Sequence, residues 1–377
     1  MGRCGRICLA FVLAVIMLPA CVKKVSNQEG KAVEPMELSQ QLRKYFYDPK
    51  VICFGRYAIS APLGAQLNWG TYSLPSPIDV NQDTPDAQDR QIAYDLQKLK
   101  IADKTSEIIY NGPGPVSNSW LIRYFEHIFA KEDDFYLAKA YLKLNGFIFL
   151  FRYSRRDGEL LSDFMSRIAD QLKSARMRSD EETPVEPGYC IEHGFLATST
   201  YNQQETVSAG IYIPGLPDVT FSVSSNKDAY SAYSSAEFEG RVRGELSLLA
   251  RITAAQDQQG INYPKRTVLR EGKRTVQHWK GEESLIRRAD GTHDFEWAFV
   301  GTPGDVANPS EFSVQMYTKV AHNTVGAADK ASLTDEEAIA LWDKLLSGLK
   351  FRVKVPGAPE GSYYFLPGAA TDGGGKP

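Results

Sequence analysis

Histidine and cysteine, which supply many metal ligands and nucleophiles in proteins, are scarce in this sequence. Its 377 residues include five of each. No two histidines stand at the spacing of metal ligands, and there is no Gly-x-Ser-x-Gly elbow, His-Glu-x-x-His helix or phosphate-binding loop. We therefore expect no enzyme, no metal and no cofactor. A hydrolase whose catalytic triad is assembled from distant residues is the alternative.

Two groups of polar residues are interpreted as surface features. His293 precedes Asp294 and is expected in a turn before a strand. Glu132, Asp133 and Asp134 form a short acidic run, which is interpreted as a solvated loop and not as a pair of catalytic carboxylates.

The chain also lacks a strong charge of either sign. Without residues 1–20 it carries 41 basic and 46 acidic residues, a net charge of −5. Nucleic-acid binding would require a basic patch or stripe, so nucleic acid is not an expected partner. Aromatic residues are plentiful, with 18 Phe, 19 Tyr and 5 Trp. They suffice for large cores, and the length allows about two domains.

The apolar run near the N-terminus, residues 7–18, is too short to span a bilayer, which needs about 20 apolar residues. It follows two arginines and precedes Ala20 and Cys21, which is the layout of a bacterial export signal. We expect residues 1–20 to be a lipoprotein signal peptide and Cys21 to carry lipid. The protein would then be periplasmic, and Val22 after the cysteine is compatible with an outer-membrane anchor. An ordinary secretory signal with an incidental cysteine is the alternative.

Beyond Cys21, the mature chain contains Cys53 and Cys190. The oxidising periplasm favours a disulfide between them. Two buried free thiols are the alternative, because free cysteine often packs as a small hydrophobe.

Composition divides the mature chain into segments. Residues 21–35 are polar and irregular, as in a tether, and residues 356–377 form a Gly-, Pro- and Ala-rich tail that we expect to be flexible. Residues 179–187 are charged and contain two prolines, which predicts a linker. The linker would separate an N-terminal domain, residues 36–178, from a C-terminal domain, residues 188–355.

Both domains are predicted to be α+β, each with an antiparallel sheet, packed helices and a similar order of elements. Each begins with a cysteine-bearing strand, at residues 51–57 and 188–195, and continues into a helical stretch, at residues 86–101 and 235–255. A hairpin and an amphipathic helix follow in both.

The first of these hairpins has a strong local signal. Residues 138–144 alternate between apolar and polar side chains, and Asn145-Gly146 follows, a pair typical of a type I′ turn. The strand over residues 147–153 completes the hairpin, and apolar residues recur at helical spacing over residues 161–172.

The second hairpin and its helix are predicted by the same patterns. Apolar side chains alternate over residues 295–299 and again over residues 312–316. Thr334 and Glu337 then stand at the spacing of a capping box, and Gly348 is expected to end the helix that they begin.

A candidate surface for binding a partner lies in residues 226–238. Tyr230, Tyr233 and Phe238 stand there among Ser, Asn and Asp, a composition typical of protein-binding loops. The alternative is that the aromatic rings pack on their own domain.

Several short motifs resemble one known family. The stretch from Cys53 to Tyr57, Cys-Phe-Gly-Arg-Tyr, resembles the opening of the periplasmic immunity proteins that neutralise lipase effectors of the type VI secretion system. The second half resembles the C-terminal domain of that family over residues 281–285, 295–301, 314–316, 333–338, 341–343 and 350–352. The resemblance covers residues 34–353 and is strongest from Gly188 onward.

The resemblance implies a stoichiometric inhibitor and not an enzyme. It implies two domains arranged as a clamp, a cognate lipase or phospholipase effector as partner, and a membrane contact through lipid on Cys21. An envelope-assembly or cell-wall-binding lipoprotein without a toxin partner is the alternative function.

Overall fold

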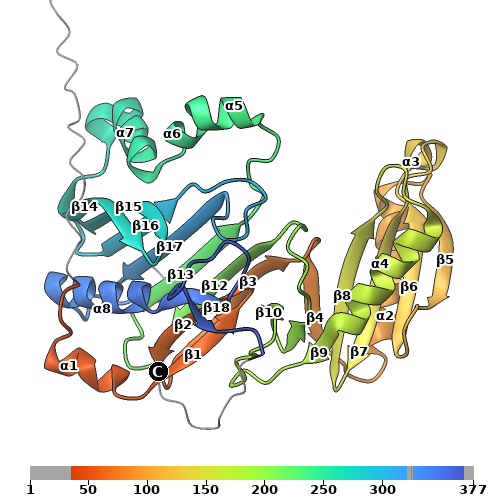
Figure 1. Ribbon diagram of the computed structural model, residues 1–377, viewed down its shortest axis with the longest axis horizontal. Helices are drawn as coiled ribbons and strands as arrows, with labels where there is room; N and C mark the ends of the chain where they lie inside the picture. The colour runs from red at the N-terminus through yellow and green to blue at the C-terminus, as the bar shows by residue number, and fades with distance from the viewer. Residues whose placement is uncertain (1–34, 321–323, 325, 369–377) are drawn as a thin grey trace, which may run out of the picture. The chain divides into compact units, whose positions relative to one another are not determined.

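Four β-sheets with helices beside them make up the computed structural model, which describes residues 35–320, 324 and 326–368 (Figure 1). The α+β class predicted from the sequence is confirmed. Residues 1–20, Cys21 and all but the last residue of the expected tether lie outside the described residues.

The largest sheet has seven strands, and every neighbouring pair is antiparallel. In sheet order its strands are β14 (Arg266–Val276), β15 (Trp279–Arg288), β16 (His293–Phe299), β17 (Glu311–Thr318), β13 (Val219–Asn226), β12 (Thr206–Tyr212) and β3 (Gln66–Ser73). The predicted alternation holds on β16 and β17, where Phe295, Trp297, Phe312, Val314 and Met316 are buried.

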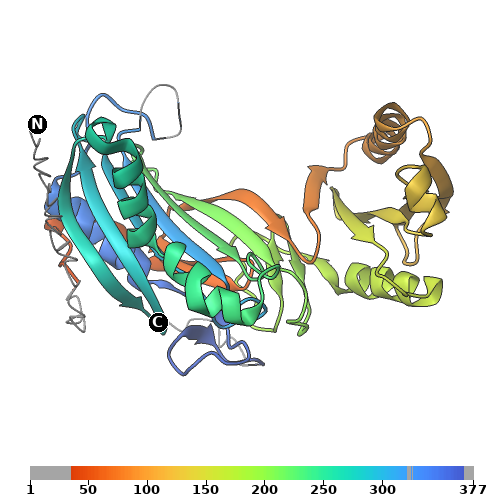
Figure 2. The ribbon, with the colours of Figure 1, turned by 90° about the horizontal axis from the view of Figure 1, so that it is seen from above.

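Helices cover both faces of this sheet (Figure 2). On the inner face, Trp342 of α8 (Asp335–Ser347) packs against Phe295 with ring centroids 6.0 Å apart. On the outer face, Arg251 of α7 (Leu248–Gln259) pairs with Glu296 at 3.0 Å. The predicted capping box begins α8, and the helix ends at Gly348, whose φ of −79° is ordinary and not left-handed.

A five-stranded antiparallel sheet, which we call the small sheet, lies in the first half of the chain. In sheet order its strands are β4 (Ile78–Gln82), β8 (Phe147–Ser154), β7 (Leu137–Leu144), β6 (Ser119–Phe125) and β5 (Glu107–Pro113). Asn145 and Gly146 both have positive φ, and the predicted hairpin of β7 and β8 is confirmed.

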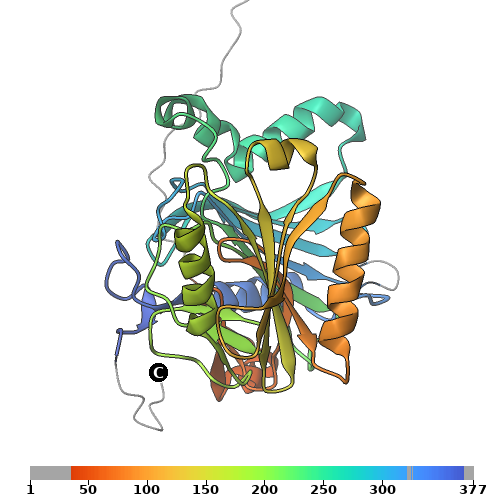
Figure 3. The ribbon, with the colours of Figure 1, turned by 90° about the vertical axis from the view of Figure 1, so that its right-hand side faces the viewer.

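Successive residues of β8 pack on opposite helices, because side chains alternate across a strand. Phe149 lies in the cluster of α4 (Leu161–Ser174), and Ile148 lies in the cluster of α2 (Ala87–Ala102). Figure 3 shows the two helices on either side of the small sheet. The small and large sheets therefore resemble each other in having a helix packed on each face.

Two smaller sheets and several short helices complete the described residues. The four-stranded sheet has the order β1 (Pro49–Phe54), β2 (Tyr57–Pro62), β18 (Leu349–Val353) and β19 (Tyr363–Phe365). The three-stranded sheet has the order β10 (Tyr189–Ile191), β11 (Gly194–Leu196) and β9 (Ala175–Met177). The short helices are α1 (Gln40–Arg43), η1 (Lys44–Phe46), α3 (Ile128–Glu132), α5 (Ser235–Glu237), η2 (Phe238–Val242), α6 (Arg243–Glu245) and η3 (Gly260–Asn262).

Three predicted elements differ from the structure. The strands expected at residues 51–57 and 188–195 are tight hairpins, because Gly55 and His193 have positive φ and turn the chain. The helix expected over residues 235–255 is broken, since a π-helical turn follows Glu237 and α7 starts anew after Ser247.

The sheets also cut across the predicted domain boundary. Strand β2 pairs with β18, and β3 pairs with β12, so strands from the first 73 residues complete sheets of the second half. An aromatic cluster supports this pairing, with Tyr57 stacked on Phe351 at 5.2 Å and in edge contact with Phe312 at 5.1 Å. The expected split between residues 36–178 and 188–355 therefore does not describe the sheets.

The prediction of a flexible tail over residues 356–377 is wrong for the part that forms a strand. Residues Tyr363–Phe365 form β19, which pairs in parallel with β18, and Phe351 donates its backbone N–H to Ser362 at 3.0 Å. Residues 369–377 lie outside the described residues.

Candidate functional site

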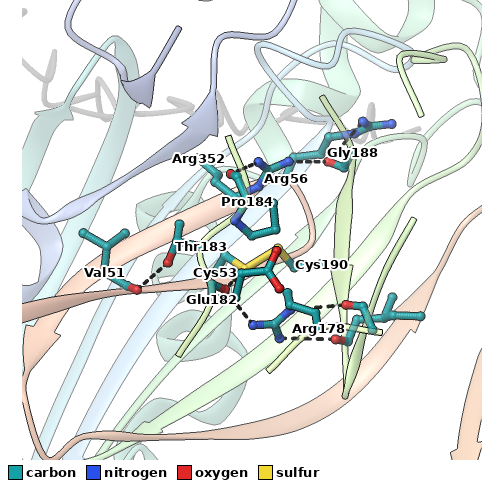
Figure 4. The surroundings of a disulfide bond; sticks show 12 residues. Val51, Cys53, Arg56, Arg178, Glu182, Thr183, Pro184, Gly188, Cys190 and Arg352 are labelled. Atoms are coloured by element: carbon teal, nitrogen blue, oxygen red, sulfur yellow. Dashed lines mark hydrogen bonds between the residues drawn. A yellow bond between two sulfur atoms is a disulfide. The ribbon is translucent and has the colours of Figure 1, made fainter. Parts of the chain in front are cut away.

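The connection between the two halves is anchored by a disulfide (Figure 4). Cys53 and Cys190 are bonded to each other, so the predicted disulfide is confirmed. Both cysteines are buried, and they join β1 to β10. Beside them Gly55 and Cys190 exchange two backbone hydrogen bonds of 2.9 and 2.8 Å.

The predicted linker is held in place by buried arginines and is not a free connection. Arg352 donates to the carbonyl oxygens of Pro184, Glu186 and Gly188, the last two at 2.9 and 3.1 Å. Arg178 donates to the carbonyl of Glu182 at 3.0 Å. Buried carbonyls need such partners, so the backbone of this segment is packed although the side chains of Asp180 and Glu181 are exposed.

A third buried arginine, Arg56, connects the end of the predicted linker to the residues just before β12. It pairs with Glu205 at 2.7 Å and donates to the carbonyls of Gly188 and Thr200 at 3.3 and 2.7 Å. Burial alone would lower the pKa of Arg56, but the carboxylate of Glu205 outweighs it and raises the pKa. For Arg352 burial dominates and lowers the pKa to about 10.

One arrangement in the structure has the order of a catalytic triad. His293 lies with Nδ1 2.7 Å from Thr318 Oγ1 and Nε2 2.9 Å from Asp335 Oδ1. A triad needs an exposed nucleophile, but Thr318 is fully buried and also accepts the backbone N–H of His293 at 3.2 Å. The three residues therefore join β16, β17 and the start of α8.

Burial also corrects the interpretation of His293, which is not a residue of a surface turn but is 2% exposed on β16. Asp294, the next residue, faces the opposite way and pairs with Arg288. Among the residues that the structure describes, no group of three His, Cys, Asp or Glu side chains is placed to hold a metal ion.

The three candidate partner-binding aromatics have different environments. Phe238 is 2% exposed, so this ring packs on its own domain and does not form a binding surface. Tyr230 stacks on Phe238 with ring centroids 5.8 Å apart and is half-buried. Tyr233 is 44% exposed and lies in the turn between β13 and α5. The structure thus leaves Tyr233 as the exposed aromatic ring of the segment.

A hollow that sequence reasoning missed lies over the outer face of β3, β12 and β13. It has a volume of about 340 Å³ and is lined by Trp69, Ser208, Gly210, Tyr212 and Ser222 among others. Ser208, Gly210 and Ser222, which carry small side chains or none, leave this space open. The signal in the sequence is the run of Ser and Gly at alternate positions of β12, which is visible only once the strand and its buried face are known.

These features define an α+β protein with an exposed aromatic turn and a hollow over one sheet face. The chain belongs to the family of Tle cognate immunity protein 4. The family's N-terminal domain model matches residues 50–183, and its C-terminal domain model matches residues 182–354. The resemblance inferred from the sequence is thereby confirmed.

Solved structures share the fold. The apo immunity protein TplEi of the type VI secretion system from Pseudomonas aeruginosa is 22% identical, with a TM-score of 0.61 over 81% of this chain and 97% of that chain. The same protein with an "L" peptide is 22% identical, with a TM-score of 0.59 over 81% and 99%. A chain of the Tle4–Tli4 complex is 21% identical, with a TM-score of 0.60 over 81% and 98%. No curated protein sequence matches the chain.

Proposed function

We propose that this protein binds and inhibits a cognate lipase effector in the periplasm and so protects membrane phospholipids from hydrolysis. The match of both domain models of an immunity-protein family, over residues 50–183 and 182–354, is the observation that carries the proposal. The shared fold with a chain solved in the Tle4–Tli4 complex supports a protein partner.

The buried disulfide supports an oxidising compartment, because cytosolic thiols are kept reduced. Among the described residues, no helix is long and apolar enough to cross a membrane. Attachment through lipid on Cys21, to the outer membrane, would hold the inhibitor near the lipids that the effector attacks.

For the partner-binding surface we propose the turn that carries Tyr233, with Tyr230 as its support. An exposed tyrosine offers a large ring and a hydroxyl with little conformational entropy to lose, and such residues often dominate binding energies. The stacking of Tyr230 on Phe238 fixes the turn beneath it. Phe238 contributes by packing and does not touch the partner.

The test is co-purification with the lipase encoded beside this protein, together with survival of cells that export that lipase to the periplasm. We expect a stable complex and rescue of growth. If neither is seen with full-length, exported protein, the proposed function is wrong.

The surface is tested separately with Tyr233→Ala, which we expect to weaken binding at least about tenfold, as for a typical hot-spot residue. Tyr47→Ala is the matched control. Tyr47 is also an exposed tyrosine, at 92%, and it follows η1, far in the sequence from the turn that carries Tyr233. Equal affinities for both variants would reject the Tyr233 surface and leave the function standing.

A further inference from the structure

Five large apolar side chains are exposed together at one end of the small sheet, a patch that we call the apolar tip. Its members come from α3, from the loop after it and from the start of α4: Ile128, Phe129, Phe135, Leu160 and Leu161, which are 41%, 68%, 42%, 65% and 48% exposed. Figures 1 and 3 both show α3 and the start of α4 at the same end of the small sheet.

Hydrogen bonds fix the segments of the tip against one another. The backbone N–H of Phe135 donates to the carbonyl of Ala130 at 2.7 Å. Arg155 joins the loop after α3 to the start of α4, because its guanidinium donates to the carbonyls of Asp134 and Glu159 at 2.6 and 2.9 Å. The apolar side chains are therefore held at the surface by a rigid framework.

The tip is not an extension of the core. The inward positions of α4 are occupied by Phe164, Ile168 and Leu172, all buried at helical spacing. Leu161 continues that spacing but is 48% exposed at the first turn, and Leu160 before it is 65% exposed. Single exposed apolar residues are normal on a soluble protein, but several gathered on one surface indicate a binding site.

Acidic residues predominate in the segments that form the apolar tip. Residues 126–135 and 155–161 contain six carboxylates against three Lys and Arg residues. Two of those cations are already paired, Lys131 with Glu107 and Arg155 with Asp134. In the described part of the chain, four exposed carboxylates of the tip have no ion-pair partner: Glu126, Glu132, Asp133 and Asp157.

An anionic phospholipid membrane also combines apolar groups with negative charge, since its acyl chains lie beneath acidic headgroups. A protein surface that binds such a membrane is apolar with Lys and Arg at its border. The apolar tip is complementary to that kind of surface, whereas its carboxylates would be repelled by the membrane itself.

We propose that the apolar tip imitates an anionic lipid surface and docks onto the lipid-binding face of the lipase effector. This inference rests on the proposed function and adds a second contact surface, besides the Tyr233 turn, and the chemistry that it recognises. The effector then cannot hold the tip and the membrane with the same face, so binding of the inhibitor displaces the effector from lipid.

The experiment is a flotation assay with the purified effector and vesicles of phosphatidylethanolamine and phosphatidylglycerol. We expect the full-length inhibitor to release effector from the vesicles. The double variant Phe129→Ser/Leu160→Ser should need at least about ten times more protein for the same release. Glu132→Lys/Asp133→Lys should be weakened as well, and added salt should reduce the difference because it screens exposed charges.

The matched control is Ile261→Ser, which removes a fully exposed apolar side chain from η3 and should release effector as well as the unaltered protein does. Melting temperatures of all variants check that each is folded.

If the wild-type inhibitor binds the effector but both double variants release the effector from vesicles as well as the wild type does, the role of the tip is rejected and the proposed function stands. Flotation of the inhibitor alone would show that the tip binds membranes and would also reject the proposal. No binding between wild-type inhibitor and effector would refute the proposed function, and with it the occupant of the tip.

Discussion

Cys53 and Cys190 are 137 residues apart in the sequence, yet their sulfur atoms are bonded, and each lies in a different one of the two matched family domains. The disulfide stands beside the segment where the two domain models meet, at residues 182–183. Arg352 binds the carbonyls of that same segment. The connection between the halves is therefore a packed part of the protein.

Removing the disulfide should cost substantial stability. Cys53→Ala/Cys190→Ala releases a closed loop of 137 residues, and loss of a native disulfide typically costs about 2–5 kcal/mol. Urea unfolding of the variant and of the wild type measures the difference. The wild type with a reductant is the control and should lose a similar amount, whereas an unchanged unfolding midpoint would contradict the role given to the disulfide.

Arg352 should be as important as the disulfide for the junction. In Arg352→Met the carbonyls of Pro184 and Glu186 lose their side-chain donor, and each unsatisfied buried group costs about 1–3 kcal/mol. We expect a lower free energy of unfolding and faster proteolysis near residues 179–187. The matched control is Lys354→Met, which removes an exposed cation two residues further along the chain and should leave both measurements unchanged. Equal behaviour of the two variants would contradict the role given to Arg352.

Asp343 lies at the centre of a buried ionic cluster beneath α8. Its carboxylate accepts from Arg270 at 2.5 Å and from Arg274 at 2.7 Å, and it also accepts the backbone N–H of Met36 at 2.9 Å. Glu283 pairs with the same two arginines at 2.7 Å. Burial alone would raise the pKa of Asp343, but the two arginines outweigh burial and lower it.

A lowered pKa makes stability depend on pH in a known direction. The stabilisation from Asp343 is present above the pKa of an unfolded aspartate, about 4, and is lost as the pH falls through the lower pKa of the folded state. Asp343→Asn should cost about 3–5 kcal/mol at pH 7, because it leaves buried cations underpaired. Unfolding free energies between pH 7 and pH 2.5 should fall less steeply in the variant than in the wild type; parallel curves would contradict this account.

The aromatic segment after β13 should separate packing from binding. Phe238→Ala removes a buried ring and should lower the free energy of unfolding by about 3–5 kcal/mol. Tyr233→Ala removes an exposed ring, and its effect on stability should stay within about 0.5 kcal/mol. Equal losses of stability in the two variants would show that Tyr233 is also a packing residue.

The anchor is tested through Cys21. Mass spectrometry of the mature protein should show residues 1–20 removed and lipid on Cys21, and Cys21→Ser should abolish the lipid. Equal protection of cells by the lipid-free protein would show that only the periplasmic location matters for function.

Local patterns predicted the elements that depend on local chemistry. Asn145-Gly146 specifies a turn that needs positive φ at two residues, and Thr334 and Glu337 cap α8 with each other's backbone. In both cases the deciding contacts lie within a few residues of the chain. The same holds for the alternation on β16 and β17.

Local sequence patterns could not predict contacts between distant segments of the chain. The pairing of β3 with β12 and of β2 with β18 depends on strands more than a hundred residues apart. The charged segment at residues 179–187 has the composition of a linker, and only the position of Arg352 shows that its carbonyls are buried. The prediction of the binding surface failed in part for the same reason, because composition alone does not distinguish buried Phe238 from exposed Tyr233.

The central claim is that this protein is a stoichiometric inhibitor of a lipase. The most direct measurement is a titration of the purified cognate effector, acting on phospholipid vesicles, with the purified full-length mature protein. We predict that phospholipase activity falls in proportion to the added protein and is abolished near one equivalent. Undiminished activity at a large molar excess would contradict the claim.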